Sequence, residues 1–235
     1  FQSQLVNAIA DGDSPDMIVL PSDLLVSLRS KLTAISYNTI SERSFLDSYI
    51  DGASLFAMED GVYGIPFAVD PLVMFWNRDL FSSNAIALPP TTWESLVSDV
   101  VPHMTVRDDN HNIIKSAVSF GEYENVTQAK DILMLLLLQS GSQMVTESNA
   151  TYKVMLNTPV VSGAASPFES ALQFYTEFSN VNSPLYSWNR AMTQDKQTFL
   201  AGDLGLYFGL ASEYYDIAAK NPNLNFDMTS VPQGA

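Results

Sequence analysis

The side chains in this sequence that could bind a small molecule follow runs of apolar residues typical of buried strands. These runs are Met17–Leu20, Ile113–Phe120 and Leu204–Phe208. The polar segments after them contain Ser22 with Asp23, Glu122 with Tyr123, and the turn Gly209–Glu213. Small ligands of α/β sheets bind at the carboxyl ends of strands. We therefore expect these side chains, and the backbone N–H groups of the turn, to hydrogen-bond a solute.

Some of these candidates also have structural interpretations. Ser and Asp favour helix N-caps, so Ser22 and Asp23 could instead begin a helix. Tyr123 is the strongest candidate of its segment, because an aromatic side chain at a strand end has no obvious core partner in the sequence. Asn125 is expected to cap the following helix.

A tryptophan in a polar loop is a further candidate. Trp188 and Asn189 follow the segment Asn182-Ser183-Pro184. An exposed indole there would offer a flat surface on which a ligand could stack, with the amide of Asn189 beside it. The alternative is that Trp188 fills a small satellite core.

Residue sets typical of catalysis or metal binding are weak in this chain. The two histidines, His103 and His111, are not accompanied by a Gly-x-Ser-x-Gly motif. Cysteine is absent, which excludes a thiolate nucleophile and a zinc-thiolate site. The acidic run 11–16 lacks the Gly and Glu that a calcium loop needs at its sixth and twelfth positions. We therefore expect no enzyme activity, metal or cofactor.

Composition indicates a folded protein with a small partner. The 235 residues include 26 acidic and 11 basic ones, for a net charge of −15, and 46% are hydrophobic. Phosphate backbones and anionic membranes would repel this chain, so nucleic acid is not an expected partner.

The apolar run Ile132–Leu138 is shorter than the roughly 20 residues that cross a bilayer. The chain starts without an initiator Met or a basic leader, so we expect a fragment.

Helices that alternate with strands must position these groups. Further strands are expected at Ile65–Val69, Leu72–Trp76 and Leu224–Met228, and a hairpin joins Met104–Val106 to Ile113–Val118. Helices are expected before Gly12, after Ser41, after the capping box Thr91–Glu94, from Asn125 to Leu138, after the box Ser166–Glu169, and over Met192–Leu200 and Ser212–Ala219. Only Asp70-Pro71 separates two of the strands, which predicts that the chain passes there from one layered unit to another.

Four segments match, in order, the motifs of one known family. They are 10–17 with Pro15-Asp16, 64–81 with Asn77-Arg78-Asp79-Leu80-Phe81, Pro90-Thr91-Thr92-Trp93-Glu94, and 199–208 followed by Val231-Pro232-Gln233. In these residues the chain resembles the extracellular solute-binding proteins of ABC transporters, family 1, the maltose-binding-like group. Each motif is weak alone, but the ordered set spans nearly the whole chain.

The resemblance implies an α/β, periplasmic-binding-protein-like (type II) two-lobed fold, present here as a partial lobe 1 plus most of lobe 2. Residues 1–70 would be the partial lobe 1, which lacks its first strands and its later return segment. Residues 71–230 would be lobe 2, and residues 231–235 would start the return hinge crossing.

The resemblance also implies a function. Such a protein captures a small solute, here a carbohydrate, when the two lobes close about the hinge. The implied partner is the permease of an ABC importer, and the protein is expected to be an extracytoplasmic monomer whose leader is not in this chain. Asp70 matches an acidic ligand contact of the family, although it could be only a turn residue. Leu210 and Ala211 stand where maltose-binding relatives have tryptophan, which argues against maltodextrins.

Two other functions stay open. A saccharide-acting enzyme would use Asp70 with Glu122 or Glu213 as acid and base, and would need the two carboxyl groups roughly 5–10 Å apart. A ligand-sensing module of a signalling receptor would have the same binding chemistry. A transmembrane or kinase segment in the same gene would identify the receptor.

Overall fold

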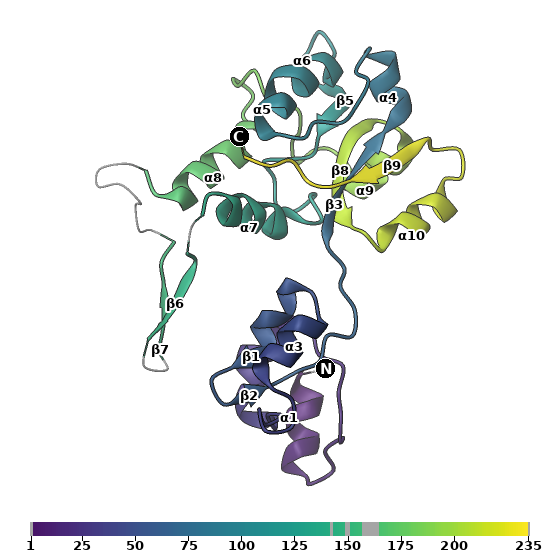
Figure 1. The fold of residues 1–235 in the computed structure, drawn as a ribbon. Helices are drawn as coiled ribbons and strands as arrows, with labels where there is room; N and C mark the ends of the chain where they lie inside the picture. The colour runs from purple at the N-terminus through teal and green to yellow at the C-terminus, as the bar shows by residue number, and fades with distance from the viewer. Residues whose placement is uncertain (1, 142, 149–150, 157–164, 235) are drawn as a thin grey trace. The chain divides into compact units, whose positions relative to one another are not determined.

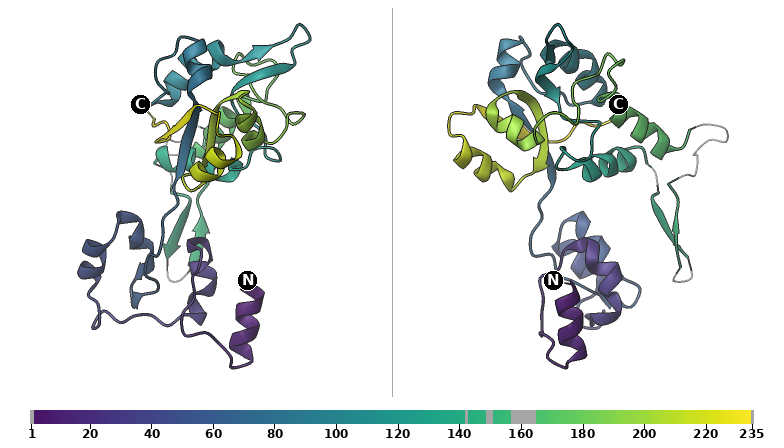
Figure 2. Two further views of the ribbon diagram at one scale, coloured as in Figure 1. Left: turned by 90° about the vertical axis from the view of Figure 1, so that its right-hand side faces the viewer. Right: turned by 180° about the vertical axis from the view of Figure 1, so that it is seen from behind.

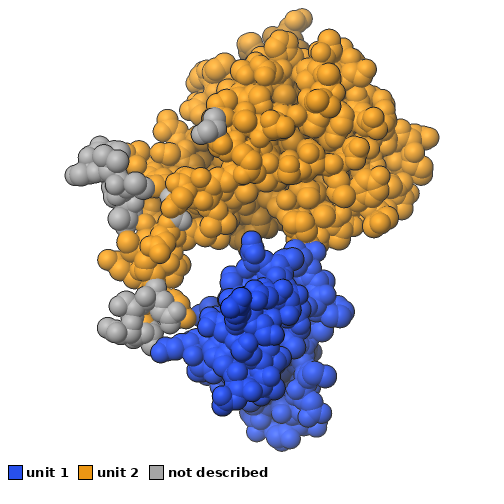
Figure 3. Space-filling view, in the orientation of Figure 1, with its two compact units in different colours: residues 1–69 blue, residues 70–235 orange. Residues whose placement is uncertain are grey.

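The chain divides between Val69 and Asp70 in the computed structural model. Unit 1 is Phe1–Val69 and unit 2 is Asp70–Ala235 (Figure 3). The structure describes residues 2–141, 143–148, 151–156 and 165–234. The Asp70-Pro71 pair that suggested a change of unit in the sequence therefore begins unit 2.

Unit 2 is built on a mixed five-stranded sheet with the strand order β4-β5-β8-β3-β9 (Figures 1 and 2). Its strands are β3 (Leu72–Asn77), β4 (Val106–Arg107), β5 (Ile113–Val118), β8 (Leu204–Leu210) and β9 (Phe226–Thr229). Strand β5 is parallel to β8, whereas β3 is antiparallel to both β8 and β9. Phe75 of β3 lies opposite Tyr207 of β8 and Met228 of β9. The continuous apolar run in β8 suits a central strand buried on both faces.

Helices connect the strands of unit 2. They are α4 (Arg78–Ser83), α5 (Trp93–Ser95), the π-helical turn Leu96–Val100, α6 (Val101–Met104), α7 (Ala129–Gln139), α8 (Pro167–Glu177), α9 (Asp195–Ala201) and α10 (Glu213–Lys220). Helices α7 and α8 pack side by side (Figure 1), and a hairpin of β6 (Val145–Ser148) and β7 (Thr151–Val154) lies between them in sequence. Ser166 and Glu169 form the expected capping box at α8.

The core of unit 2 is rich in aromatic rings. The rings of Phe75 and Tyr207 stack at 5.8 Å, and those of Trp93 and Phe208 stack at 6.0 Å. Aromatic pairs of this kind add stability beyond the apolar area that they bury. The indole N–H of Trp93 donates to Gln139 Oε1 at 2.6 Å. Nε2 of Gln139 in turn donates to the Pro232 carbonyl at 2.8 Å. The segment after β9 is thereby fixed to unit 2.

Unit 1 has a smaller core, formed by Phe45, Ala53 and Val62. Its α-helices are α1 (Gln2–Ala10), α2 (Leu25–Leu28) and α3 (Glu42–Ser48); its 3₁₀ turns are Ser22–Leu24, Arg29–Lys31 and Asp51–Phe56; its strands are β1 (Ala57–Met58) and β2 (Gly61–Val62). The side chain of Ser41 caps α3 as expected, accepting from the Ser44 N–H. Gly12 follows α1 with a left-handed φ of 77°.

Two expected strands of this unit are wrong. Met17–Leu20 and Ile65–Val69 carry no strand assignment, and Met17 is 90% exposed and Phe67 85% exposed. A strand needs the backbone of a neighbour to complete its hydrogen bonds. Within the described part of the chain, neither segment pairs with another strand, and most of their apolar side chains are exposed: Met17, Val19, Ile65, Phe67 and Val69.

Two helix starts also differ from the expectation. The capping box near Trp93 pairs Thr92 with Ser95, one residue later than the Thr91–Glu94 pairing. Asn125 does not cap α7, which begins only at Ala129. The amide of Asn125 is instead hydrogen-bonded to residues more than 60 positions away in sequence, a partner set that no local pattern reveals.

No helix among the described residues is long and apolar enough to span a membrane.

Candidate functional site

Most of the candidate residues lie at one edge of the sheet in unit 2. Because β5 and β8 are parallel and β3 is antiparallel to β8, the carboxyl ends of β5 and β8 share an edge with the start of β3. We call this the strand-end edge and define it by residues 70–71, 119–128 and 209–213. The topology therefore brings together Asp70, Glu122, Tyr123, Gly209 and Glu213, which are far apart in the sequence.

The carboxylate of Asp70 is engaged by the turn that begins α10. It accepts from the Ser212 N–H at 2.9 Å and from the Ser212 hydroxyl at 2.6 Å. Beside it, the Ala211 N–H donates to the Pro71 carbonyl at 3.0 Å. Asp70 thus ties the start of β3 to the end of β8, and each of its oxygens has a partner within the protein.

Glu213 has an internal role as well. Its carboxylate accepts from the Leu210 N–H and the Tyr207 hydroxyl, both at 2.9 Å, and pairs with Nζ of Lys196 at 2.6 Å. Burial, together with the negative charge of Glu213, raises the pKa of Tyr207. A Cβ on Gly209 would come within 2.5 Å of the Tyr207 ring and 2.9 Å of Glu213 Oε1. Glycine is required there because these two side chains occupy the space.

Lys196 joins α9 to α10. Its ammonium group lies 2.6 Å from Glu213 and 2.8 Å from Asp216, while Lys220 pairs with Asp216 at 3.0 Å. Burial acts to lower the pKa of Lys196, but its hydrogen bonds to Asp216 and Glu213 outweigh this and raise it. The hydrogen bonds from Lys196 and Lys220 lower the pKa of Asp216. The ammonium groups of Lys196 and Lys220 thus balance the carboxylates of Glu213 and Asp216.

The segment after β5 presents an exposed aromatic candidate. Tyr123 is 76% exposed. Glu122 beside it has a side chain only 15% exposed, and Oε2 pairs with the guanidinium of Arg190 at 3.5 Å. The Tyr175 hydroxyl donates to the Glu122 carbonyl at 2.6 Å, and burial raises the pKa of Tyr175. An accessible aromatic ring and an adjacent ion pair are therefore present at the edge.

The exposed stacking surface expected at Trp188 is not present. The indole is fully buried in the core of unit 2, and its N–H donates to Asn125 Oδ1 at 3.1 Å. The alternative interpretation, a core residue, describes this position better, because polar flanking residues do not prevent a loop from packing inward. Asn189 remains partly exposed, and its amide donates to the Tyr186 hydroxyl at 2.8 Å.

Ser22 and Asp23 belong to unit 1. They begin the 3₁₀ turn Ser22–Leu24, both are exposed, and its N-cap is Pro21, without a side-chain capping bond. The structure therefore does not give them the helix-cap role considered from the sequence. The strand that was expected to precede them is also absent, so the strand-end argument for their binding role loses its basis.

Sequence reasoning missed the residues that connect the strand-end edge to α9. Asn125 Nδ2 donates to the carbonyls of Asn189 and Met192, at 2.9 and 3.0 Å. Asp195 is fully buried and accepts from the Thr127 N–H at 2.8 Å and the Thr127 hydroxyl at 2.6 Å. Burial raises the pKa of Asp195. The only available sequence signal was that Asp195 is a charged residue at a helix start.

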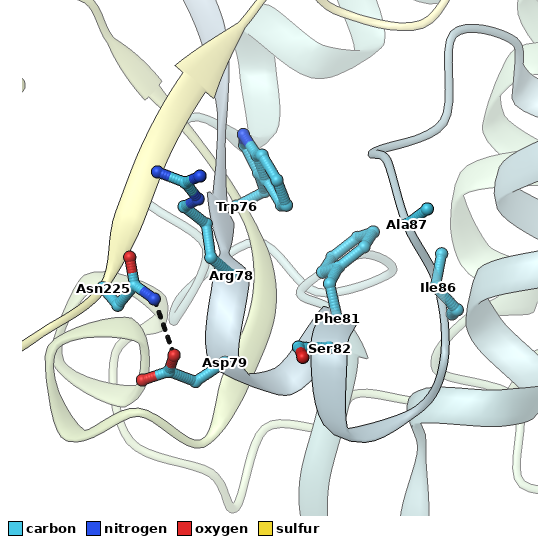
Figure 4. A pocket seen from close by; sticks show the side chains of 8 residues that line it. All are labelled: Trp76, Arg78, Asp79, Phe81, Ser82, Ile86, Ala87 and Asn225. Atoms are coloured by element: carbon cyan, nitrogen blue, oxygen red, sulfur yellow. Dashed lines mark hydrogen bonds between the residues drawn. The ribbon is translucent and has the colours of Figure 1, made fainter.

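A separate pocket of about 340 Å³ lies at the other end of β3 (Figure 4). Its lining includes Trp76, Arg78, Asp79, Phe81 and Asn225. Asn225 donates to Asp79 at 2.7 Å, and the Arg78 guanidinium lies 5.7 Å from the Trp76 ring centroid. None of the residues expected to bind a solute lines this pocket. We therefore place the candidate site at the strand-end edge, because the predicted ligand-binding side chains gather there.

The strand-end edge and the neighbouring residues 189–190 carry groups that can contact a ligand. Tyr123 offers an aromatic face, and Glu122 offers a carboxylate paired with Arg190. The neighbouring Asn189, whose carbonyl accepts from Asn125, offers an amide. Asp70 and Glu213 already accept hydrogen bonds within the protein. Among the described residues, no cluster of three or more His, Cys, Asp or Glu side chains is arranged to hold a metal ion. The arrangement suits a ligand with a flat apolar face and several hydroxyl groups.

Comparison with known proteins identifies relatives of the whole chain. A family model for bacterial extracellular solute-binding proteins matches residues 1–235. A binding protein of Brucella abortus is 21% identical over 233 residues, which are 98% of this chain and 53% of that protein. The chain thus spans about half the length of the curated relatives it matches.

Solved structures share the fold. An ABC transporter solute-binding protein from Thermotoga lettingae, bound with α-D-tagatose, is 19% identical with a TM-score of 0.65; the match covers 100% of this chain and 58% of that one. A cyclic α-maltosyl-1,6-maltose binding protein from Arthrobacter globiformis is 20% identical with a TM-score of 0.72, covering 100% and 56%. These matches confirm the predicted fold class, a part of the two-lobed α/β fold.

Proposed function

Because the chain belongs to the family of bacterial extracellular solute-binding proteins, we propose that it captures a small solute for an ABC importer. The family description agrees with the resemblance found in the sequence and implies an extracytoplasmic location. The proposed partners are the solute and the permease of the transporter.

One observation supports the strand-end edge as the binding surface of this function. Tyr123 is 76% exposed although it follows, five residues after Val118, the buried carboxyl-terminal half of β5. Partly exposed polar side chains lie beside it. Strand ends of α/β sheets are where ligands bind, and an exposed ring there can contact a ligand without any rearrangement of the core. We propose Tyr123, Glu122 and Asn189 as the solute contacts of unit 2.

We propose a carbohydrate as the solute. An aromatic ring that covers the apolar face of a sugar, with carboxylates and amides taking its hydroxyl groups, is the chemistry that such a ligand needs. The net charge of −15 disfavours anionic solutes. The related structures bound with α-D-tagatose or named for a cyclic maltosyl-maltose agree with this choice.

The proposed mechanism is closure of two lobes, with unit 2 supplying one wall of the solute site. In this proposal residues 1–70 belong to lobe 1, residues 71–230 form lobe 2, and residues 231–235 start the return crossing. A solute that contacts both lobes stabilises their closed arrangement by those contacts alone. The permease would recognise the closed form.

Binding explains the strand-end edge better than the saccharide-acting enzyme. That enzyme would need two free carboxyl groups at one site. Asp70 gives both oxygens to Ser212, and Glu213 is held by Tyr207, Leu210 and Lys196. Incubation with saccharides, followed by product analysis, would reveal hydrolysis if the enzyme reading were right.

Titration calorimetry tests the function. The protein, with any residues that its gene encodes beyond this chain, is titrated with a panel of mono- and oligosaccharides, a polyamine and a peptide. We expect binding of a neutral saccharide that Tyr123→Ala weakens by at least about tenfold, the loss of one stacking contact. Tyr215→Ala is the matched control, since Tyr215 is 80% exposed on α10. Binding of only the polyamine or the peptide would overturn the carbohydrate proposal.

A further inference from the structure

The loop that carries Tyr123 is held in place on both sides of the exposed ring. We define the Tyr123 loop as Gly121–Thr127. The carbonyl of Gly121 accepts from the Ser179 hydroxyl at 3.0 Å, and the carbonyl of Glu122 accepts from the Tyr175 hydroxyl at 2.6 Å. Beyond the tyrosine, the carbonyl of Glu124 accepts from Gln194 Nε2 at 2.9 Å. An exposed side chain thus stands on a backbone that is fixed before and after it.

The far end of the loop is anchored by two buried side chains. Asn125 is 5% exposed and donates to the carbonyls of Asn189 and Met192, while its own Oδ1 accepts from Trp188. Asp195 accepts from the N–H and the hydroxyl of Thr127, and the Asp195 N–H donates to the Asn125 carbonyl at 3.1 Å. These bonds join the Tyr123 loop to residues 188–195 without contacting the accessible face of the ring.

The start of the loop is fixed by sterics. Gly121 has a φ of 94°, and a Cβ there would lie 2.7 Å from the backbone and side chain of Ser179. Only glycine takes this conformation without strain and allows so close an approach. The loop therefore has one backbone path from β5 to α7 that keeps Tyr123 outside and Asn125 inside.

We propose that Asn125 and Asp195 are positioning residues that pre-organise the Tyr123 loop for solute binding. Ordering a flexible loop when the ligand arrives costs affinity, and a loop ordered beforehand avoids that cost. Asn125 also donates to the carbonyl of Asn189. The same anchoring residue therefore positions the proposed aromatic contact, Tyr123, and the proposed polar contact, Asn189. This inference rests on the proposed function, and it adds that affinity depends on buried residues that do not contact the solute.

Four substitutions separate a positioning role from a general effect on stability. Asn125→Asp keeps the acceptor for Trp188 but removes both N–H donors. Thr127→Val removes one hydroxyl that bonds to Asp195 and keeps the side-chain shape, while Thr127→Ser restores that hydroxyl. Val101→Ala, in the buried core at α6, is the control that lowers stability away from the loop.

Calorimetry with the tightest-binding saccharide of the panel is the first measurement. We expect Asn125→Asp and Thr127→Val to weaken binding by about tenfold, with a less favourable binding entropy, at a temperature where all variants are folded. Thr127→Ser and Val101→Ala are expected to bind like the unchanged protein. Unchanged affinity in Asn125→Asp and Thr127→Val, with only a lower Tm, would overturn the inference.

Hydrogen exchange separates this inference from the proposed function. If the unchanged protein binds no saccharide, the carbohydrate proposal fails by itself. The amides of residues 121–127 still report on the anchors: faster exchange in Asn125→Asp and Thr127→Val than in Thr127→Ser supports the positioning role. Equal exchange in all these variants would show that the anchors do not order the loop.

Discussion

Asp70 accepts two hydrogen bonds from Ser212, one from its N–H at 2.9 Å and one from its hydroxyl at 2.6 Å, although the two residues are 142 positions apart in the sequence. The contact joins the first residue of unit 2 to the turn that begins α10. It also gives an internal role to the carboxylate that the sequence placed among the solute contacts.

The first prediction concerns this contact. Asp70→Ala is expected to lower the free energy of unfolding by about 1 kcal/mol, because Ser212 loses both acceptors at a site that water can reach. Asp70→Asn, which keeps one acceptor, should lose less. Urea unfolding measures both. If saccharide affinity falls much more than stability does, Asp70 contacts the solute in addition to Ser212.

The second prediction concerns Tyr207. Tyr207→Phe is expected to lower the free energy of unfolding by about 1 kcal/mol, because the half-buried carboxylate of Glu213 loses one donor. Because the pKa of Tyr207 is raised in the folded protein, the folded protein binds the phenolic proton more tightly than the unfolded chain does. The stabilisation from the Tyr207 hydroxyl is therefore lost only at alkaline pH. An absorbance titration of the phenolic groups should show Tyr207 ionising together with unfolding. Ionisation of every tyrosine before unfolding would contradict this.

The third prediction concerns the ion pairs of Lys196. The pKa of Asp216 is lowered from 3.8, so its contribution is present above that pH and is lost as the pH falls through the folded value. The pKa of Lys196 is raised from 10.5, so its contribution is present below that pH and is lost as the pH rises further. Asp216→Asn should therefore lower Tm between these limits, and the difference in Tm should shrink as the pH falls through the lowered folded pKa of Asp216. Calorimetric scans measure this. A Tm difference independent of pH would contradict it.

The fourth prediction concerns the three tryptophans. A variant with Trp76→Phe and Trp93→Phe keeps Trp188, whose indole is fully buried. Its fluorescence is expected to be blue-shifted and poorly quenched by acrylamide, because a buried ring is shielded from the quencher. A second variant that keeps only the partly exposed Trp76 should be quenched more strongly. Strong quenching of the Trp188 fluorescence would contradict this prediction and would indicate that the indole is exposed, as the sequence had suggested.

Local patterns in the sequence predicted most elements of unit 2. The box Ser166–Glu169 begins α8, the run that starts at Leu204 forms β8, and Leu72–Trp76 falls within β3. These signals work because capping and burial on both faces are decided by residues a few positions apart. The predictions for unit 1 were less accurate. Met17–Leu20 and Ile65–Val69 are apolar enough to form strands, but within the described residues no neighbouring strand pairs with them.

The sequence by itself determined the family and the fold class, since the ordered motifs along the chain carry that information. Only the tertiary structure decided which side chains are available at the site. It buried Trp188 against Asn125, 63 residues away, and paired Asp70 with Ser212, while Tyr123 stayed exposed on an anchored loop. Exposure and hydrogen-bond partners depend on contacts between distant segments, and no spacing within one segment specifies those contacts.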